Sequence, residues 1–370
     1  MLAALLETEV LPARIPGYTP ATLDAITAES DLMWFGVGRE KIALCFSHNR
    51  DLFAADSAKG EWMEAAQRLF ADARGQYYFN VLLDQTRMSS AELAQTLWKL
   101  VWEGKASNDT FGALRKGIEA DFKVREPGVS VRRTGRLSHR AQFSAWKSSR
   151  AYPGAWRMLP PPEPPADLID LEELNKDRVR VLLMRYGVVF RELLARELPA
   201  LRWGALFRAL RLMELSGEIV TGNFFNGVPG IQFASHEAVR TLQQGLDHDA
   251  VYWLNGADPA SLCGADLESI KHDLPKRIPG THLVYHGNRL VIVSKSYGKN
   301  IEIRVPPDHP RLTDYFGFLR AMLTRAFRPM HRISIEKING DRVLYSPYLS
   351  WLRDSFEVTA DPKTVWLWLR

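Results

Sequence analysis

The stretch that decides the fold is residues 177–235, which read DRVRVLLMRYGVVFRELLARELPALRWGALFRALRLMELSGEIVTGNFFNGVPGIQFAS. It holds three helical patterns in sequence, followed by two short stretches that are typical of β-strands. In the third pattern, Arg202–Leu215, apolar side chains recur at spacings of three and four residues, as on the buried side of an amphipathic helix. This apolar stripe consists of Trp203, Leu206, Phe207, Leu210 and Met213. The other side of the helix carries Arg202, Arg208 and Arg211.

A short hairpin is predicted directly after this helix. Gly217 is expected to end the helix, and Glu218–Thr221 is predicted as a strand. Asn226-Gly227 is a hairpin-turn signal, and Ile231–Phe233 is the predicted return strand. The order of helix, turn, basic helix and hairpin is typical of a winged helix. Because helices of this kind commonly enter a DNA groove, nucleic acid is the first partner to consider.

The composition is that of a globular protein with a mild basic bias. The chain has 370 residues, 46% of them hydrophobic and 25% charged, with a formal net charge of +5. This length predicts two to four domains, each able to bury a core. The positive charge fits a nucleic-acid partner, but many proteins that bind no nucleic acid are equally basic.

Cysteine usage and hydropathy favour a reducing, aqueous compartment. Cys45 and Cys263 lie far apart in the sequence, so neither a disulfide framework nor a structural zinc site is expected. Met1–Leu6 is too short for a signal peptide and lacks its basic flank, and no apolar run approaches membrane-spanning length. We therefore expect a soluble cytoplasmic protein with no membrane partner.

The whole chain is predicted to be an α+β multidomain protein. We expect tandem winged-helix units, a small β-barrel or sheet domain and an α/β C-terminal piece. In order, the segments are a partial winged-helix or β end piece (1–55), a helical winged-helix-like unit (56–123), a basic Pro-rich linker (124–167), a winged helix (168–245), a β-barrel-like domain with a helix (246–330), and the α/β C-terminal piece (331–370).

The segment 56–123 repeats the order of elements in the opening stretch. Ser89-Ser90-Ala91-Glu92 is a capping-box start for a helix that ends before Gly104. Its predicted buried stripe consists of Leu93, Leu97, Leu100 and Val101. Residues 96–104 align with 209–217 at their Leu and Gly positions. We therefore predict two winged-helix-like units, the first with a poor wing.

The linker 124–167 combines positive charge with aromatic side chains. Its basic residues include Arg125, Arg132, Arg133, Arg136, Arg140, Lys147 and Arg150. Trp146, Tyr152 and Trp156 lie among them, and such a mixture can hold phosphates and stack on bases. A linker strapped over neighbouring domains by its aromatic side chains would have the same composition, so both interpretations stay open.

Strings along nearly the whole chain resemble the region that follows the motor core in the large helicase-related (Lhr) proteins. They are VLPARIPGY, TLDAI, LMWFGVG, LWKLVWEGKASNDTF, GAWRMLP, RYGVVFRELL, ALRLMELSGEIVTGNFF, GVPGIQFA, VYWLNGADPAS and RISIEKINGDRVLYSP. The sequence has no Walker A GKT, no DExH box and no other helicase motif, so ATP hydrolysis is not expected of it. The chain therefore resembles the C-terminal domain of an Lhr-type helicase on its own.

The resemblance implies properties that the residue patterns alone do not. It implies winged-helix units around a β-barrel, a fold similar to the AlkZ-type DNA glycosylases, and assembly into a homotetramer. It also implies uracil-DNA glycosylase activity, a role in DNA repair, and a motor in the full-length protein that moves on single strands.

A glycosylase takes its base out of the stack and stabilises a positively charged sugar, usually with a carboxylate that can also activate water. The resemblance implies a catalytic aspartate at the extreme C-terminus, and Asp361 is our candidate because it directly precedes the final predicted strand, TVWLWLR. Trp366 and Trp368 alternate with leucines there, so both face one side and could stack on a flipped base. Alternatively, Asp361 only forms a turn and the tryptophans close a core.

The candidate DNA contacts are mostly basic or amide side chains. They are Arg202, Arg208 and Arg211 on the basic helix, Asn223 and Asn226 on the wing, Arg150 in the linker, and Lys295 and Lys299 beyond the turn at 286–288. Exposed arginines are as often solvated or buried at a subunit contact, and a winged helix can also hold two proteins together. Gln232 does not meet the Q-x-Q or Q-x-D motif of AlkZ-type enzymes, and we expect it to bond within its own hairpin.

Two hypotheses follow. In the first, the chain self-associates, and we expect a tetramer. It binds single-stranded or uracil-containing DNA and removes uracil by base flipping. It does so without a metal or cofactor, since His248, His272 and His282 lack metal-ligand spacing. In the second, it is a non-catalytic DNA-binding and oligomerisation scaffold for its own helicase motor, which is present only in the full-length protein.

Overall fold

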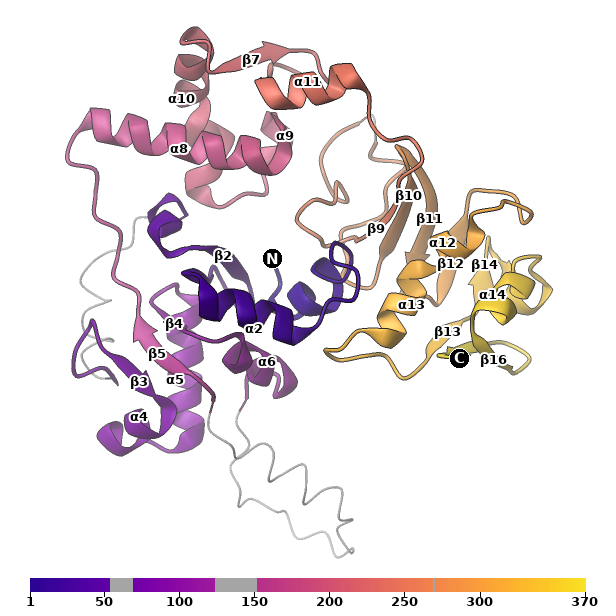
Figure 1. Ribbon diagram of the computed structural model, residues 1–370, viewed down its shortest axis with the longest axis horizontal. Coiled ribbons are helices and arrows are strands. Elements are labelled where there is room, and N and C mark those ends of the chain that lie inside the picture. Colours follow the sequence, from indigo (N-terminus) through magenta and orange to yellow (C-terminus); the bar gives the residue numbers. More distant parts are fainter. Residues whose placement is uncertain (54–68, 124–151, 269) are drawn as a thin grey trace, which may run out of the picture. The chain divides into compact units, whose positions relative to one another are not determined.

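The protein is described by a computed structural model, which covers residues 1–53, 69–123, 152–268 and 270–370 (Figure 1). The chain divides into two compact units. The first consists of Met1–Ala4 and Ala21–Pro164, and the second of Leu5–Pro20 and Pro165–Arg370. In the described part of the chain, no helix combines the length and the apolar character that crossing a membrane requires.

The first unit is built on two small antiparallel sheets. β1 (Leu32–Gly36) pairs with β2 (Ile42–Phe46). In the other sheet, β5 (Ala155–Met158) lies between β3 (Gln76–Tyr78) and β4 (Ala106–Asn108). The helical elements are α1 (Ala3–Leu5), α2 (Pro20–Glu29), η2 (Ser47–Leu52), α4 (Phe79–Thr86), α5 (Ser90–Trp102) and α6 (Phe111–Glu119). Cross-strand pairing with β5 holds the three residues of β3 extended.

Helix α5 begins and packs as predicted. The Ser89 hydroxyl accepts the Glu92 backbone N–H, and the Glu92 carboxylate accepts that of Ser89. The predicted stripe of Leu93, Leu97, Leu100 and Val101 is buried. Tyr152 and Trp156 also lie in this core, so these two linker aromatics are not available to stack on bases. Trp146 and the basic residues named for the linker, Arg150 among them, lie outside the described residues.

The winged helix predicted in the second unit is confirmed. It contains α8 (Leu168–Tyr186), β6 (Val188–Val189), α9 (Arg191–Leu194), η3 (Pro199–Leu201), α10 (Trp203–Leu215), β7 (Ile219–Gly222), β8 (Gln232–Ser235) and α11 (His236–Gln244). The strand order is β6-β8-β7, and Gly217 ends α10 with a φ of 77°. One member of the predicted stripe is wrong: Phe207 is 41% exposed, and Ala209 is buried beside Leu210 in its place.

A six-stranded sheet follows the winged helix in the chain. Its order is β15-β14-β12-β11-β10-β9, and β12 and β14 are parallel. The strands are β9 (Val251–Asn255), β10 (His282–His286), β11 (Arg289–Lys295), β12 (Asn300–Ile303), β14 (Lys337–Ile338) and β15 (Asp341–Arg342). In the described residues the edge strands β9 and β15 do not pair with each other, so the sheet is open. Of the two predicted alternatives, a β-barrel and a sheet, the structure therefore has the sheet.

The last part of the chain shares one core with this sheet. β17 (Val365–Trp368) lies between β13 (Ile333–Ile335) and β16 (Glu357–Ala360). The neighbouring helices are α12 (Leu312–Tyr315), α13 (Gly317–Thr324), η4 (Val343–Tyr345) and α14 (Leu349–Ser355). A continuous cluster of buried side chains runs from Val284 on β10 to Leu367 on β17. Asn339 and Gly340 form the turn between β14 and β15, and both have the positive φ that a two-residue hairpin needs.

Candidate functional site

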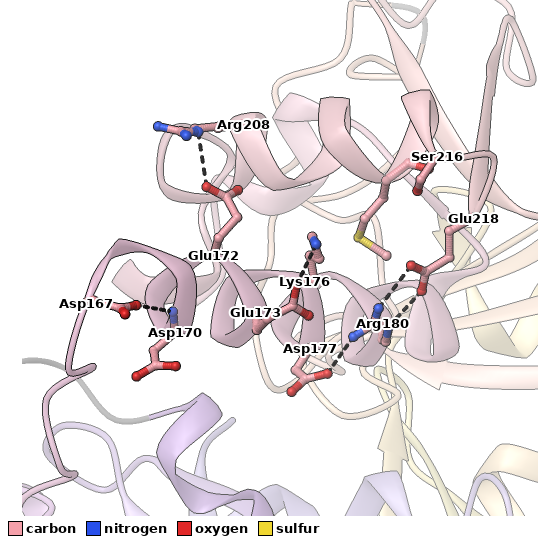
Figure 2. Close-up of polar contacts among 11 residues, drawn as sticks. Asp167, Asp170, Glu172, Glu173, Lys176, Asp177, Arg180, Arg208, Ser216 and Glu218 are labelled. Carbon is pink, nitrogen blue, oxygen red and sulfur yellow. Dashed lines mark hydrogen bonds and ion pairs between the residues drawn. The ribbon is translucent and has the colours of Figure 1, made fainter.

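The three arginines of the basic helix are all held by acceptors of the same chain. Arg208 is 80% exposed at its side chain, and its Nε lies 3.0 Å from Oε2 of Glu172 on α8 (Figure 2). Arg211 pairs with Glu214 one turn further along α10. Arg202 donates from Nε to the Glu197 carbonyl oxygen at 3.1 Å. A phosphate on this helix would therefore have to exchange with partners that the arginines already have.

Helix α8 carries further ion pairs below α10. Arg180 donates to both carboxylate oxygens of Glu218, at 2.6 and 2.9 Å, and to Asp177 at 2.7 Å (Figure 2). These hydrogen bonds, the one to Glu218 first, raise the pKa of Arg180. Lys176 pairs with Glu173 at 2.6 Å. This side of the winged helix is therefore balanced in charge.

Apolar side chains interrupt the charged surface of the winged helix. Phe207, Leu212 and Leu215 on α10 are 41%, 37% and 76% exposed, and Met184 on α8 is 82% exposed. A groove of about 630 Å³ is lined by residues of α8, β7, β8 and α11, including Met184 and Leu242. Exposed apolar side chains of this size suit a protein contact.

The wing is held from inside by Gln232. Its buried side-chain oxygen accepts the backbone N–H groups of Phe224 and Phe225, and its nitrogen donates to the Phe225 carbonyl oxygen at 2.9 Å. This confirms that Gln232 bonds within its own hairpin. Asn223 and Asn226 are exposed in the loop that Gln232 holds. The wing therefore has a fixed base and two amide side chains directed to solvent.

The two candidate lysines differ in their surroundings. Lys295 ends β11 and is exposed. The exposed Lys299 lies 3.0 Å from Glu336, measured from Nζ to Oε1. Of the two, Lys295 is more readily available to a phosphate.

The C-terminal hairpin brings together Asp361 and the two tryptophans. Oδ1 of Asp361 accepts the backbone N–H groups of Lys363 and Thr364, both at 2.7 Å, in the turn between β16 and β17. Trp366 and Trp368 are only half-buried, whereas Val365 and Leu367, which alternate with them along the strand, are fully buried. Both of our alternatives are thus partly met: Asp361 does shape a turn, and the tryptophans lie on the outer face rather than in the core.

A buried carboxylate that sequence reasoning missed lies in the second unit. Glu9 belongs to the short π-helix η1 (Leu6–Val10) and is 1% exposed. Its Oε2 lies 2.9 Å from Nε2 of His282 on β10, and its Oε1 accepts Nη1 of Arg325 at 2.7 Å. Burial alone would raise the pKa of Glu9, but the hydrogen bonds and charges of His282 and Arg325 outweigh burial and lower it.

A second ion pair, of which only the carboxylate is buried, ties the same N-terminal segment to the sheet region. Arg14 donates to both oxygens of Asp258, each at 2.7 Å, and Asp258 is fully buried. All four oxygens of Glu9 and Asp258 are thus engaged by basic side chains of this chain. Carboxylates that are paired in this way are better suited to stabilising the fold than to reacting with a substrate. The sequence feature that could have indicated a buried Glu9 is AALLETEVL, an apolar run interrupted by Glu7 and Glu9.

In the part of the chain that the structure describes, no group of three His, Cys, Asp or Glu side chains is arranged to hold a metal ion. Cys45 and Cys263 are buried free thiols, and burial raises the pKa of Cys45 to about 11. A thiol with so high a pKa is a poor nucleophile at neutral pH.

Comparison with known proteins identifies the winged helices. Residues 1–47 and 169–254 each match a family model described as large helicase-related protein, winged-helix domain. The resemblance to the large helicase-related proteins is confirmed. The chain is 28% identical over 367 residues to an Lhr helicase/probable uracil glycosylase of Mycolicibacterium smegmatis, and 26% identical over 392 residues to an Lhr helicase/uracil glycosylase of Escherichia coli.

These matches cover 92% and 95% of this chain, which spans only 24% of the length of each relative. Among solved structures, the DNA glycosylase AlkZ of Streptomyces sahachiroi matches 81% of this chain and 81% of its own, with 13% identity and a TM-score of 0.43.

Most of the predicted site residues that the structure describes fall into two groups along the chain. Arg202, Arg208 and Arg211 gather on or beside α10, next to the wing. Asp361, Trp366 and Trp368 share the C-terminal hairpin. The charged partners of the α10 arginines and the buried Glu9 centre were not predicted.

Proposed function

We propose that this chain belongs to a DNA-repair protein, binds DNA and removes uracil from it by base flipping. One observation carries the proposal: two relatives named both helicase and uracil glycosylase align with 92% and 95% of this chain. The sequence has no phosphate-binding or DExH motif of a helicase motor. Of the two activities in those names, base removal is therefore the one we assign to these 370 residues.

The proposed reaction is hydrolysis of the N-glycosidic bond. Water adds to C1′ of the sugar while the bond to uracil breaks, and the electron pair of that bond leaves with the base. A carboxylate stabilises the positive sugar and accepts the proton of the water. Asp361 is the proposed carboxylate, and the two backbone N–H groups on its Oδ1 support the role because they fix its orientation. Trp366 and Trp368 on the same hairpin are proposed to stack on bases.

The proposed DNA contacts lie on the winged helix, around the turn between β11 and β12, and in the linker. They are Arg202, Arg208, Arg211, Asn223, Asn226, Lys295, Lys299 and Arg150. The exposure of Arg208, Lys295 and the wing asparagines supports this assignment. In the full-length protein, the motor would deliver the strand to them.

A direct assay tests the proposal. The purified chain is incubated with an end-labelled oligonucleotide that contains one uracil, and alkali then cuts any abasic site. We expect cleavage at the uracil position, and about a 100- to 10,000-fold lower rate in Asp361→Asn, since asparagine can still accept the two turn hydrogen bonds but cannot take a proton. Asp354→Asn, an exposed acid of the same region, is the matched control.

Two results would count against the proposal. Absence of cleavage above background in the folded wild-type chain excludes uracil removal. Normal cleavage by Asp361→Asn, with Asp354→Asn equally active, excludes Asp361 as the carboxylate but leaves the activity standing.

The alternative function is a non-catalytic scaffold that binds DNA, self-associates and supports the helicase motor. The exposed Phe207, Leu212 and Leu215 favour it, because they give α10 an apolar surface where a DNA-reading helix usually has polar side chains. A chain that retains DNA, sediments as an oligomer such as a tetramer and releases no uracil would establish this alternative.

A further inference from the structure

The outer face of the C-terminal sheet carries two tryptophans and an arginine in mutual contact. Trp366 and Trp368 are two residues apart on β17, so their side chains leave the same face about 7 Å apart. The guanidinium of Arg332 lies 5.6 Å from the ring centroid of Trp366 and 5.8 Å from that of Trp368. One cation therefore spans the interval between two aromatic rings.

This face is separate from the hydrophobic core. The inward residues of the same strands, Ile333, Ile335, Val365 and Leu367, are fully buried. On the outer face, Trp366 is flanked by the small polar side chains of Ser334 and Thr359, and the Trp368 indole N–H donates to the Thr359 hydroxyl at 3.1 Å. Arg332 is exposed. Aromatic rings with a neighbouring arginine on an open sheet form the usual surface for stacking unpaired bases.

We propose that this face binds one step of single-stranded DNA, with two successive bases stacked on Trp366 and Trp368 and the phosphate between them on Arg332. Bases stacked in a duplex are about 3.4 Å apart along each strand, which is half the spacing of the two residues along β17. Only an extended strand, whose bases have separated, can place neighbouring bases on both tryptophans. A duplex does not expose the faces of its bases at all.

The charges beside the tryptophans determine the side on which the DNA backbone passes. Arg332 directly precedes β13, on one side of Trp368. Glu357 is paired with Trp368 on the other side, on β16. A phosphate is attracted by the arginine and repelled by the glutamate, so the backbone runs along β13.

The choice of DNA as the polymer rests on the proposed function, which this site deepens by naming the form of DNA that is held. Asp361 lies in the turn at the end of the same hairpin. A single strand on the two tryptophans would therefore run beside the proposed catalytic carboxylate.

Binding of a uracil-free, fluorescein-labelled oligothymidylate to the full chain tests the site, with fluorescence anisotropy as the readout. Trp366→Ala and Trp368→Ala should each weaken binding roughly 5- to 150-fold, and the corresponding Phe variants should retain most of the affinity. Tyr345→Ala, which removes a 78% exposed aromatic ring outside this face, is the matched control and should bind as the wild type does. Affinity for a duplex of the same length should be unchanged in all of them.

Arg332 is tested by its effect on salt dependence. Arg332→Ala should reduce the slope of log affinity against log salt by about 0.7, as expected for the loss of one phosphate contact on a single strand. Arg332→Lys should keep the slope and lose part of the affinity, because an ammonium group holds a phosphate but lacks the planar guanidinium. Arg342→Ala removes an exposed arginine from β15 and is the control for charge.

Wild-type binding by both tryptophan-to-alanine variants, or equal losses in Tyr345→Ala, would overturn the proposal. If an alanine variant does not fold by circular dichroism, the pair Trp366→Phe and Trp366→Leu decides, because both are apolar and only one can stack. The oligothymidylate contains no uracil, so the result does not depend on base removal. A chain that binds it through the tryptophans but releases no uracil refutes the proposed activity and leaves this site intact.

Discussion

At the scale of single residues, the stability of the second unit depends on Glu9. Glu9→Gln should destabilise the protein by about 3–5 kcal/mol, because it leaves the charge of Arg325, whose side chain is only 9% exposed, without its partner. Urea unfolding, followed by circular dichroism, measures the change. Glu237→Gln, at an exposed position of α11, is the matched control and should change stability by less than about 0.5 kcal/mol.

The same residue makes a prediction about pH. The pKa of Glu9 is lowered in the folded protein from an ordinary value of 4.5, so its contribution is complete above that value and is lost as the pH falls through the folded pKa. The difference in stability between wild type and Glu9→Gln should therefore shrink below about pH 4.5. A difference that stays constant down to acid unfolding would show that the charge of Glu9 does not stabilise the fold.

Distance along the chain explains which residue roles could be predicted. Gln232 bonds to Phe224 and Phe225 within its own hairpin, and its structural role was predicted correctly. Glu9 and His282 are 273 residues apart, and Arg14 and Asp258 are 244 apart. No local pattern links residues so far apart, so only the fold could reveal these buried pairs.

At the scale of elements, the question is whether α10 meets phosphates or protein. Glu172→Gln removes the acid that pairs with Arg208 across α8 and α10 (Figure 2). If α10 contacts DNA, the freed arginine should raise affinity by roughly 2- to 5-fold at low salt, in keeping with the strength of a surface ion pair. Glu173→Gln is the control: it lies one position after Glu172 on α8 and frees Lys176 instead of an arginine. Equal affinities in wild type and Glu172→Gln would indicate that α10 does not bind DNA.

Elements with a strong local signal were predicted, and those fixed by distant pairing were not. The stop of α10 at Gly217, the wing hairpin and the final strand follow from turn residues and alternation. In contrast, β3 is a strand because it pairs with β5, which lies about 80 residues later. The openness of the large sheet likewise depends on the parallel pairing of β12 with β14. Periodicity alone does not contain that information.

At the scale of the whole molecule, the net charge of +5 raises the question of whether the basic side chains contact DNA or other subunits. If Arg202, Arg208 and Arg211 each contact one phosphate of a single strand, log affinity should fall with log salt at a slope of about −2, which is roughly a 20-fold loss between 50 and 200 mM salt. Filter binding over this range measures the slope, and sedimentation at the same salt concentrations reports the oligomeric state. A flat slope combined with an oligomer that dissociates at high salt would assign the arginines to subunit contacts. A steep slope with an unchanged oligomer assigns them to DNA, because then only the DNA complex depends on their charge.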